Sequence, residues 1–379
     1  MEVFNNIRVT HMLWGLQFGG IETMLVNILN EQVKRGLEVS CVVINDELLD
    51  ELVTKIDERV CFVCLHRKVG TKNLQFIRNL NQMLDEIAPD VIHLHNSHLF
   101  NFINRQHRRM SYTVSTVHDM PIGKIGMSCS LVNLASDFAT GMKGNVRCLN
   151  RINQVCAISN SVAQALKSQY GIDSKVVFNG IHTDSFMRNE HSNPHNTFNI
   201  VQVSRLDHEK KGQDLLIYAV SQLYNRGYKN ITLSFIGDGK SRTYLEQLVK
   251  RLKLGGVVKF LGGCQPTYVE KHLCEYDLLA QPSRYEGFGL TVAEGMAAGL
   301  PVIVSSGQGP EEITEKEHFG WTFENGNIEA LVRKIEYILN NKEEVNKKSH
   351  LAYIHVCQNY DIKVTVSRYL DVYKQVGNK

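Results

Sequence analysis

Short apolar segments alternate with longer stretches in which apolar side chains recur at helical spacing along most of the chain. The short segments predict strands at 7–13, 39–44, 60–65, 91–95, 113–118, 155–158 and 176–178, and then at 200–203, 231–236, 257–261, 277–280 and 301–304. The longer stretches predict helices at 21–35, 73–87, 161–170, 213–225, 241–252, 290–298 and 328–339. This alternation is typical of α/β proteins, in which helices cover both faces of a parallel sheet.

A polar stretch at 187–199, MRNEHSNPHNTFN, separates the two sets of strands. It is rich in Asn, His and Ser and contains a proline, a composition typical of linkers. We therefore expect two Rossmann-like domains, at 1–190 and 195–355, facing each other across a cleft. A helical segment at 356–379 is expected to follow them.

Composition narrows the class of protein. The 379 residues are 43% hydrophobic and 21% charged, as in ordinary globular proteins, and the net charge of +3 is too small to indicate a nucleic-acid partner. No apolar run is long enough to predict a transmembrane helix, and the N-terminus lacks the basic-then-apolar order of a signal peptide. The nine cysteines predict reduced, buried thiols and a cytoplasmic protein. Cys61 and Cys64 form a CxxC, but no second pair completes a zinc site, and two core cysteines are expected.

The stretch from Tyr285 to Ser306 carries two carboxylates eight positions apart, Glu286 and Glu294, among several glycines. A helix that starts near Phe288 or Gly289 would leave Glu286 in the loop before it and place Glu294 about one turn inside. Backbone N–H groups at a helix start bind anions, and carboxylates accept protons from hydroxyl groups. The combination suits a sugar nucleotide; the alternative is a buried Gly/Ala-rich helix with one capping glutamate.

With its neighbourhood, EGFG…AEGMAAGLPV, this stretch resembles the E-x7-E motif of retaining glycosyltransferases of the GT4 family, which have the GT-B fold. The resemblance implies an N-terminal acceptor-binding domain, a C-terminal nucleotide-sugar-binding domain, and a last segment that packs back toward the N-terminal domain. It implies that Glu286 positions the donor sugar and that Glu294 holds the ribose hydroxyls. The remaining donor-binding residues implied here are Gly287, Phe288, Gly289 and Leu290.

The segment NIVQVSRLDHEKKGQ resembles the family's strand, R-L-x-K-G and helix. Two cations, Arg205 and a lysine, would neutralise the diphosphate as it leaves. Lys210 and Lys211 are adjacent, and counting from Arg205 favours the first whereas counting from the following glycine favours the second. We favour Lys211 and keep Lys210 open, with a solvated basic turn as the alternative. Gly237, in FIGDGK, is expected to turn the chain near the nucleotide.

The N-terminal half contributes further family-like motifs. Gly19 and Gly20 resemble the family's glycine-rich loop, which approaches the donor phosphate, or form a plain strand-to-helix turn. No G-x-G-x-x-G occurs there, which disfavours a dinucleotide dehydrogenase. His118, in TVHD, resembles the family histidine that lies beside the transferring sugar.

Three further histidines, His93, His95 and His98, lie within six residues. Their spacing fits no catalytic zinc motif. The resemblance of PDVIHLHN to a recurring family stretch implies structural or acceptor-lining roles for them, so we expect no metal at this cluster.

These motifs predict transfer of a hexose, with retention of configuration, from a nucleoside-diphosphate sugar (UDP-sugar favoured) to a hydroxyl acceptor. The expected context is biosynthesis of cell-surface polysaccharide, lipopolysaccharide or another glycan, and the acceptor a glycan or lipid-linked molecule. No D-x-D occurs at a strand end, so we expect neither metal nor cofactor. The expected catalytic residues are His118, Arg205, Lys211 and Glu286. Another GT-B enzyme, an epimerase or phosphorylase, and an inactive assembly partner are the alternatives.

The region from Phe100 to Arg151 has an excess of basic residues. It contains Arg105, Arg108, Arg109, Lys124, Lys143, Arg147 and Arg151 against Asp119 and Asp137, seven minus two, or +5. Apolar side chains near them, such as Met110 and Met127, make a peripheral position on the anionic inner face of a membrane one interpretation. A solvated basic face is the other, and the sequence favours neither.

Overall fold

The computed structural model describes the chain apart from residues 1–6, 18, 72–73, 121–141, 189–196 and 379. The described chain forms two compact units. Unit 1 comprises residues 1–180 and 362–379, and unit 2 comprises residues 181–361. The polar stretch predicted as a linker therefore belongs to unit 2, with most of it outside the described residues. The C-terminal residues from Ile362 onward belong to unit 1.

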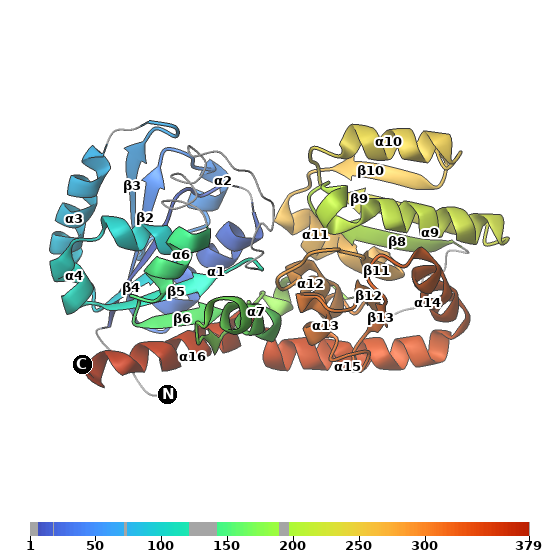
Figure 1. Cartoon of the computed structure of the whole chain (residues 1–379). Coiled ribbons are helices and arrows are strands. Elements are labelled where there is room, and N and C mark those ends of the chain that lie inside the picture. The colour runs from blue at the N-terminus through green and yellow to red at the C-terminus, as the bar shows by residue number, and fades with distance from the viewer. Residues whose placement is uncertain (1–6, 18, 72–73, 121–141, 189–196, 379) are drawn as a thin grey trace. The chain divides into compact units, whose positions relative to one another are not determined.

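Unit 1 is built on a parallel sheet of seven strands (Figure 1). In order of pairing they are β3 (Cys61–Arg67), β2 (Glu38–Asn45), β1 (Arg8–Leu13), β4 (Val91–Leu94), β5 (Tyr112–Val117), β6 (Gln154–Ala157) and β7 (Lys175–Val176). The α-helices are α1 (Gly20–Lys34), α2 (Asp50–Val53), α3 (Gln75–Ile87), α4 (Arg105–Met110), α6 (Met142–Leu149), α7 (Asn160–Tyr170) and α16 (Ile362–Tyr373). Two 3-10 segments, η1 (Ser97–Phe102) and η4 (Lys374–Asn378), complete the described elements.

The C-terminal helix α16 packs against α1 within unit 1. Arg35, just after α1, donates to the Ser367 hydroxyl over 2.7 Å and to the Lys363 carbonyl over 2.6 Å. Tyr369 and Tyr373 of α16 are fully buried, so this helix supplies part of the core of unit 1.

Unit 2 is built on a second parallel sheet, of six strands. In order of pairing they are β10 (Val258–Gly262), β9 (Ile231–Ile236), β8 (Phe198–Val203), β11 (Leu278–Gln281), β12 (Val302–Ser305) and β13 (Trp321–Phe323). The α-helices are α8 (His208–Lys211), α9 (Gln213–Asn225), α10 (Arg242–Arg251), α11 (Pro266–His272), α12 (Leu290–Ala297), α13 (Gly309–Ile313), α14 (Ile328–Asn340) and α15 (Lys342–Asn359). The 3-10 segments are η2 (Thr183–Ser185) and η3 (Leu273–Glu275). Helix α9 packs against α10 and α14, and α12 packs against α15.

Strand order reverses once within each sheet. In unit 1 the chain builds outward from β1 to β3 and then restarts beside β1 with β4. In unit 2 it builds outward from β8 to β10 and restarts beside β8 with β11. Ligands of open parallel sheets bind outside the carboxyl ends of the strands at such a reversal. The loops after β1 and β4, and after β8 and β11, are therefore the positions to examine for a site.

The prediction that Cys61 and Cys64 are both core cysteines is wrong. Cys61 is exposed and Cys64 is only half-buried, because β3 is an edge strand of its sheet. The cysteines were expected to be buried, and Cys41, Cys148, Cys156 and Cys274 are buried. No helix of the described chain is long and apolar enough to cross a membrane.

Candidate active site

The cationic and acidic residues expected to bind the donor lie at the strand reversal of unit 2. Arg205 follows β8 by two residues, and Lys211 is the last residue of α8. Glu286 lies between the end of β11 and the start of α12. Because β8 and β11 are paired neighbours, their carboxyl ends bring these loops to the same edge of the sheet.

An ion pair joins two of the predicted residues. The Lys211 ammonium donates to the Glu286 carboxylate, and the two side chains are 20% and 16% exposed. Lys210 is exposed instead, and its backbone carbonyl accepts hydrogen bonds from the N–H groups of Arg284 and Tyr285. Of the two adjacent lysines, Lys211 is therefore the one that lies at Glu286. Arg205 is exposed, and its side chain pairs with no other group in the described part of the chain.

Glu294 lies in the second turn of α12, which begins at Leu290, just after the predicted start. Its carboxylate makes no side-chain hydrogen bond with any described residue. Burial, aided by the negative charge of Glu270, raises the pKa of Glu294 to about 7. A partly buried carboxyl group with a raised pKa and no partner is typical of a functional position.

Replacing Glu294 with glutamine is expected to stabilise the ligand-free protein at pH 8 but not near pH 4.5. The folded pKa of about 7 lies above the ordinary value of 4.5. Folding therefore disfavours the charged form, and stability falls as the pH rises from the unfolded value through about 7. The neutral amide avoids this loss, about 1–3 kcal/mol at pH 8. Melting temperatures of both proteins without nucleotide, measured from pH 4.5 to pH 8, check the expectation. An equal difference at both ends of the range would contradict it.

Residues that the sequence analysis missed hold the loop that carries Glu286. Arg284 donates two hydrogen bonds of 2.8 Å to the Asp214 carboxylate and one of 2.6 Å to the His208 carbonyl. The side-chain oxygen of Gln308 accepts from the Glu286 N–H over 3.0 Å. The Arg284 contacts tie the loop after β11 to α8 and α9, and the Gln308 contact ties it to the start of α13. Only the nearness of Arg284 to Glu286 in sequence could have suggested this role.

Two glycines are required by this geometry. Gly212 has φ +67°, and a Cβ there would meet the Pro282 carbonyl oxygen at 2.0 Å, so only glycine lets the two loops approach. Gly289 caps α12 with φ +96°. Phe288 is buried, and its ring packs near Tyr360. Gly237 directly follows β9, and its N–H donates to the Gly262 carbonyl. Gly287 lies in the same loop as Glu286.

Unit 1 has a small pocket at its own strand reversal. Gly19 caps α1 and Gly20 is its first residue. A pocket of about 170 Å³ lies nearby, lined by residues that include Trp14, Glu22, Glu47, His95 and Asn96. Burial raises the pKa of Glu22. The predicted glycine-rich loop is therefore next to a hollow with polar and aromatic walls.

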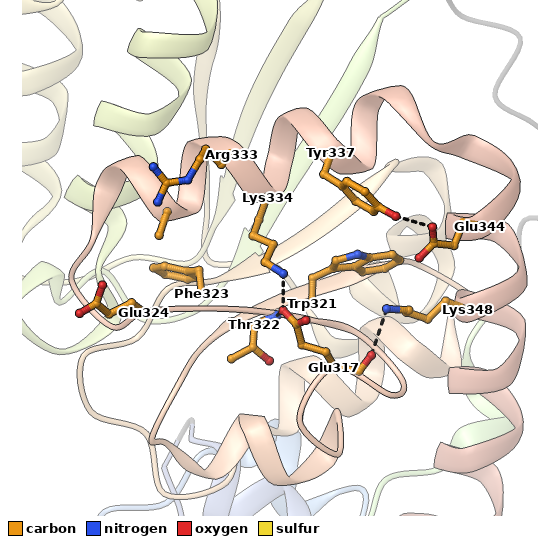
Figure 2. Close-up of a pocket in the computed structure, with 11 residues that line it drawn as sticks. Glu317, Trp321, Thr322, Phe323, Glu324, Arg333, Lys334, Tyr337, Glu344 and Lys348 are labelled. Atoms are coloured by element: carbon orange, nitrogen blue, oxygen red, sulfur yellow. Dashed lines mark hydrogen bonds and ion pairs between the residues drawn. The ribbon is translucent and has the colours of Figure 1, made fainter.

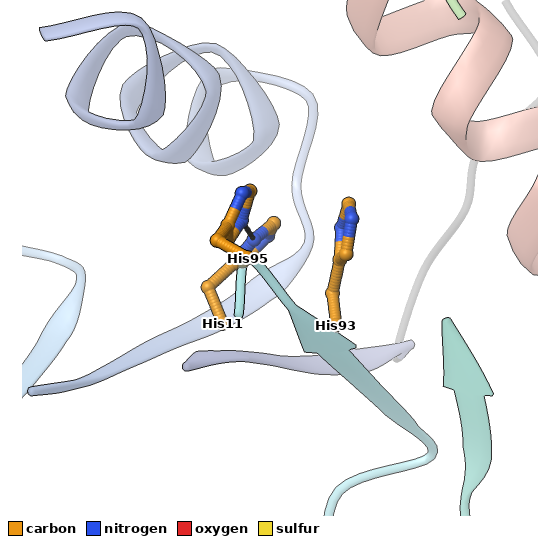
Figure 3. A group of neighbouring side chains, drawn as sticks. All are labelled: His11, His93 and His95. Atoms are coloured by element: carbon orange, nitrogen blue, oxygen red, sulfur yellow. Dashed lines mark hydrogen bonds between the residues drawn. The ribbon is translucent and has the colours of Figure 1, made fainter. Parts of the chain in front are cut away.

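His118 directly follows β5 in unit 1. Its Nε2 lies 3.0 Å from Nδ1 of His95. The expected cluster of His93, His95 and His98 is only partly present, because His11 and not His98 joins the other two (Figure 3). His98 lies in η1, beyond the end of β4, whereas β1 pairs with β4 and places His11 beside His93. Sequence spacing alone could not bring in a histidine from a strand that pairs across 82 positions.

A larger pocket, of about 490 Å³, lies between β13, α14 and α15 (Figure 2). Its walls carry none of the predicted site residues. Several of its polar groups bond to one another: Lys334 pairs with Glu317, Tyr337 donates to Glu344, and Lys348 donates to the Glu317 carbonyl and lies over the Trp321 ring. Because none of the predicted site residues lines this pocket, we do not place the reaction there.

In the basic region between Phe100 and Arg151, the structure describes five of the arginine side chains: Arg108 is half-buried, and Arg147 and Arg151 are exposed. Arg108 lies over the Phe100 ring, 4.6 Å from its centroid, and donates to the Asn101 carbonyl over 2.9 Å. Arg151 lies over the same ring. Arg105, Arg109 and Met110 of α4 are exposed. Lys124 and Met127 lie outside the described residues.

Two Rossmann-like units are the architecture of GT-B enzymes, and the Lys211–Glu286 pair lies at the strand reversal of the second unit. Family models match consecutive parts of the chain: Glycosyltransferase Family 4 at residues 18–185 and Glycosyl transferases group 1 at residues 184–353. An uncharacterised glycosyltransferase of Methanocaldococcus jannaschii is 31% identical over 286 residues, which are 68% of this chain and 71% of the relative. The chain therefore belongs to glycosyltransferase family 4.

Two further similarities cover different shares of the chain. The O-antigen biosynthesis glycosyltransferase WclY of Escherichia coli is 29% identical over 181 residues, 46% of this chain and 49% of WclY. The solved structure of HepE of Anabaena in complex with UDP and glucose has a TM-score of 0.79 at 20% identity, covering 97% of this chain and 99% of HepE. The likeness to HepE extends the shared GT-B fold over nearly the whole chain.

Proposed function

We propose that this glycosyltransferase moves a hexose from a nucleoside-diphosphate sugar to a hydroxyl acceptor with retention of anomeric configuration. The observation that carries the proposal is the Lys211–Glu286 pair, which lies just before α12, with the unpartnered Glu294 inside that helix. A cation, two carboxylates and the backbone N–H groups of a helix start are the groups that a diphosphate, a hexose and a ribose require.

The roles follow from charge. The bond to the leaving diphosphate breaks as positive charge develops on the sugar ring, and negative charge then gathers on the phosphate. Lys211 and Arg205 would neutralise that charge. Glu286, already oriented by Lys211, would accept hydrogen bonds from sugar hydroxyls and position the ring. Glu294 would accept from the ribose hydroxyls, and Gly287, Gly289 and Leu290 would offer backbone groups to the donor.

A UDP-sugar is the donor that we favour. HepE of Anabaena has been crystallised with UDP, with UDP and glucose, and with UDP-glucose, and it shares the fold of this chain. The name of WclY refers to O-antigen biosynthesis. We therefore propose a role in polysaccharide or O-antigen assembly, with a glycan or lipid-linked acceptor. A peripheral position on an anionic membrane would use the exposed side chains of Arg105, Arg109 and Met110.

Transfer from UDP-sugars is expected to continue in excess EDTA. Arg205 and Lys211 supply the positive charge that a divalent cation would supply at a D-x-D site. The test is an assay of UDP release with a panel of UDP- and GDP-sugars, with and without chelator, followed by NMR of the anomeric proton of the product. Retained configuration and equal rates are expected. Loss of activity on chelation that Mn²⁺ restores would contradict metal independence, and an inverted product would contradict the retaining mechanism.

A further inference from the structure

Four histidines form a row at the carboxyl edge of the sheet of unit 1. His11 lies on β1, His93 on β4 and His95 just after it, and His118 just after β5. The rings of His11 and His95, and those of His95 and His118, are stacked with centroids 5.3 Å apart. His11, His93 and His95 are buried. Figure 3 shows His11 and His95 joined by a hydrogen bond, with His93 beside them.

The row is not built to hold a metal ion. The ligand atoms of His11, His93 and His95 lie within 4.8 Å of one another. Every ring nitrogen of these three side chains already has a hydrogen-bond partner, however. His93 bonds to the Tyr373 hydroxyl over 2.7 Å and to the Thr116 hydroxyl over 2.8 Å. A metal ion could bind only by breaking these hydrogen bonds. The hydrogen bonds themselves are therefore the feature of the row that can have a function.

Gln32 gives the row a direction. Its amide oxygen lies 2.9 Å from Nε2 of His11, and its amide nitrogen donates to the Tyr373 hydroxyl on the other side. An amide oxygen can only accept, and His11 must therefore carry its proton on Nε2. Nδ1 of His11 is then an acceptor, and Nε2 of His95, 3.0 Å away, must donate to it.

The alternation of donor and acceptor nitrogens continues from His95 to His118. With its proton on Nε2, His95 has a bare Nδ1, which accepts from Nε2 of His118 over 3.0 Å. Nδ1 of His118 is therefore left as a bare acceptor. That atom is shielded from solvent and has no hydrogen-bond partner among the described residues. A buried acceptor without a donor is unfavourable, and a ligand hydroxyl would satisfy it.

We propose that Gln32, His11 and His95 are positioning residues that hold His118 in the Nε2–H form, so that its Nδ1 accepts a hydrogen bond from a hydroxyl of the bound substrate. This inference rests on the proposed function, since it needs a hydroxylated substrate at His118. The row works as a fixed tautomer relay: each ring determines which nitrogen of the next ring carries the proton.

The rings are neutral under ordinary conditions, which the relay requires. Burial lowers the pKa of His11 and of His118 to about 4. Burial, together with the neighbouring histidines, holds the pKa of His93 and of His95 well below the usual range. Neutral imidazoles have one donor and one acceptor each, so a single choice at Gln32 sets all three.

The first test is NMR of the whole protein labelled with ¹⁵N in histidine. Two-bond proton–nitrogen spectra distinguish protonated from bare ring nitrogens, and His118→Gln assigns the signals. We expect His118 to show a protonated Nε2 and a bare Nδ1 throughout pH 6–8. A proton on Nδ1, or averaging between the two forms, would overturn the proposal.

The second test compares two replacements of His95. The amide oxygen of His95→Asn can accept from Nε2 of His118, whereas the ring of His95→Phe fills the space but cannot accept. We expect His95→Phe to lower kcat by roughly tenfold or more with little change in the KM for the donor, and His95→Asn to stay within roughly threefold of the parent. His118 of His95→Phe should also lose its fixed tautomer in the NMR spectra.

A role in packing alone predicts the reverse order, because phenylalanine preserves the ring volume and asparagine does not. That order, or two equal losses with the tautomer of His118 unchanged, would refute the relay. The proposed function and the tautomer relay are tested separately. A parent protein that transfers no sugar removes the proposed function, while the NMR measurement on the same protein still decides the tautomer.

Discussion

Replacing Lys211 with alanine is expected to lower turnover by between about tenfold and a hundredfold. The side chain would lose a charge-assisted contact with the diphosphate, worth about 1.5–3 kcal/mol, at the stage where the leaving group carries most charge. The change also removes the partner of the Glu286 carboxylate, so the residue proposed to position the sugar would lose its orientation. Steady-state kinetics with a UDP-sugar and a titration with UDP measure the two effects.

Lys210→Ala is the matched control for that change. It is the adjacent residue, with the same charge, but its side chain is exposed and the loop uses only its backbone carbonyl. We expect its turnover to stay within roughly twofold of the parent, since an exposed charge contributes little. If Lys210→Ala lost more activity than Lys211→Ala, the assignment of the phosphate-binding lysine would be wrong.

Replacing the two carboxylates is expected to separate catalysis from nucleotide binding. Glu286→Gln should lower kcat by about ten- to a hundredfold while the affinity for UDP changes little, because that carboxylate is proposed to bind the sugar and UDP has none. Glu294→Gln should weaken UDP by about tenfold, because Glu294 is proposed to bind the ribose. Each variant changes one oxygen to nitrogen and preserves side-chain shape.

Calorimetric titration with UDP and kinetics with the UDP-sugar give the two quantities for each variant. The opposite pattern, with UDP binding lost in Glu286→Gln and intact in Glu294→Gln, would reverse the two assignments. Equal losses in both quantities for both variants would show that the carboxylates act through the stability of the loop. The expected stabilisation of Glu294→Gln at pH 8 is an independent check that this variant is folded.

The sequence pattern was sufficient to predict nearly all of the sheet structure. Each predicted strand is present within a few residues, because a strand buried on both faces must be a short apolar run. Strand β13 (Trp321–Phe323) was missed because its sequence, WTF, is interrupted by a threonine and lies between a glycine and the polar ENGN, so it forms no continuous apolar run. Helix α15 (Lys342–Asn359) was missed because its first half is charged and its apolar positions do not form a clear stripe. Its contact with α12 is what makes it a helix of the core.

The candidate site was predictable only where its residues lie close together in the chain. Glu286 and Glu294 share one stretch, and the roles proposed for them come from the motif around them. The contact between Lys211 and Glu286 joins residues 75 positions apart, and it follows from the pairing of β8 with β11. The partnership of His11 with His95, 84 positions apart, follows from the pairing of β1 with β4. Neither contact could be predicted from a local sequence pattern, because each depends on which strands pair in the folded protein.

The measurement that tests the account most directly is the binding of nucleoside diphosphates to the parent protein and to the double variant Arg205→Ala, Lys211→Ala. A thermal-shift panel of UDP, GDP, ADP, CDP and their sugars gives the affinity ranking, and calorimetry confirms the best ligand. We expect one nucleoside diphosphate, UDP, to raise the melting temperature of the parent protein, and the double variant to lose most of that effect. Stabilisation that survives unchanged in the double variant, or a parent protein that binds no nucleoside diphosphate, would contradict a donor site at the strand reversal of unit 2.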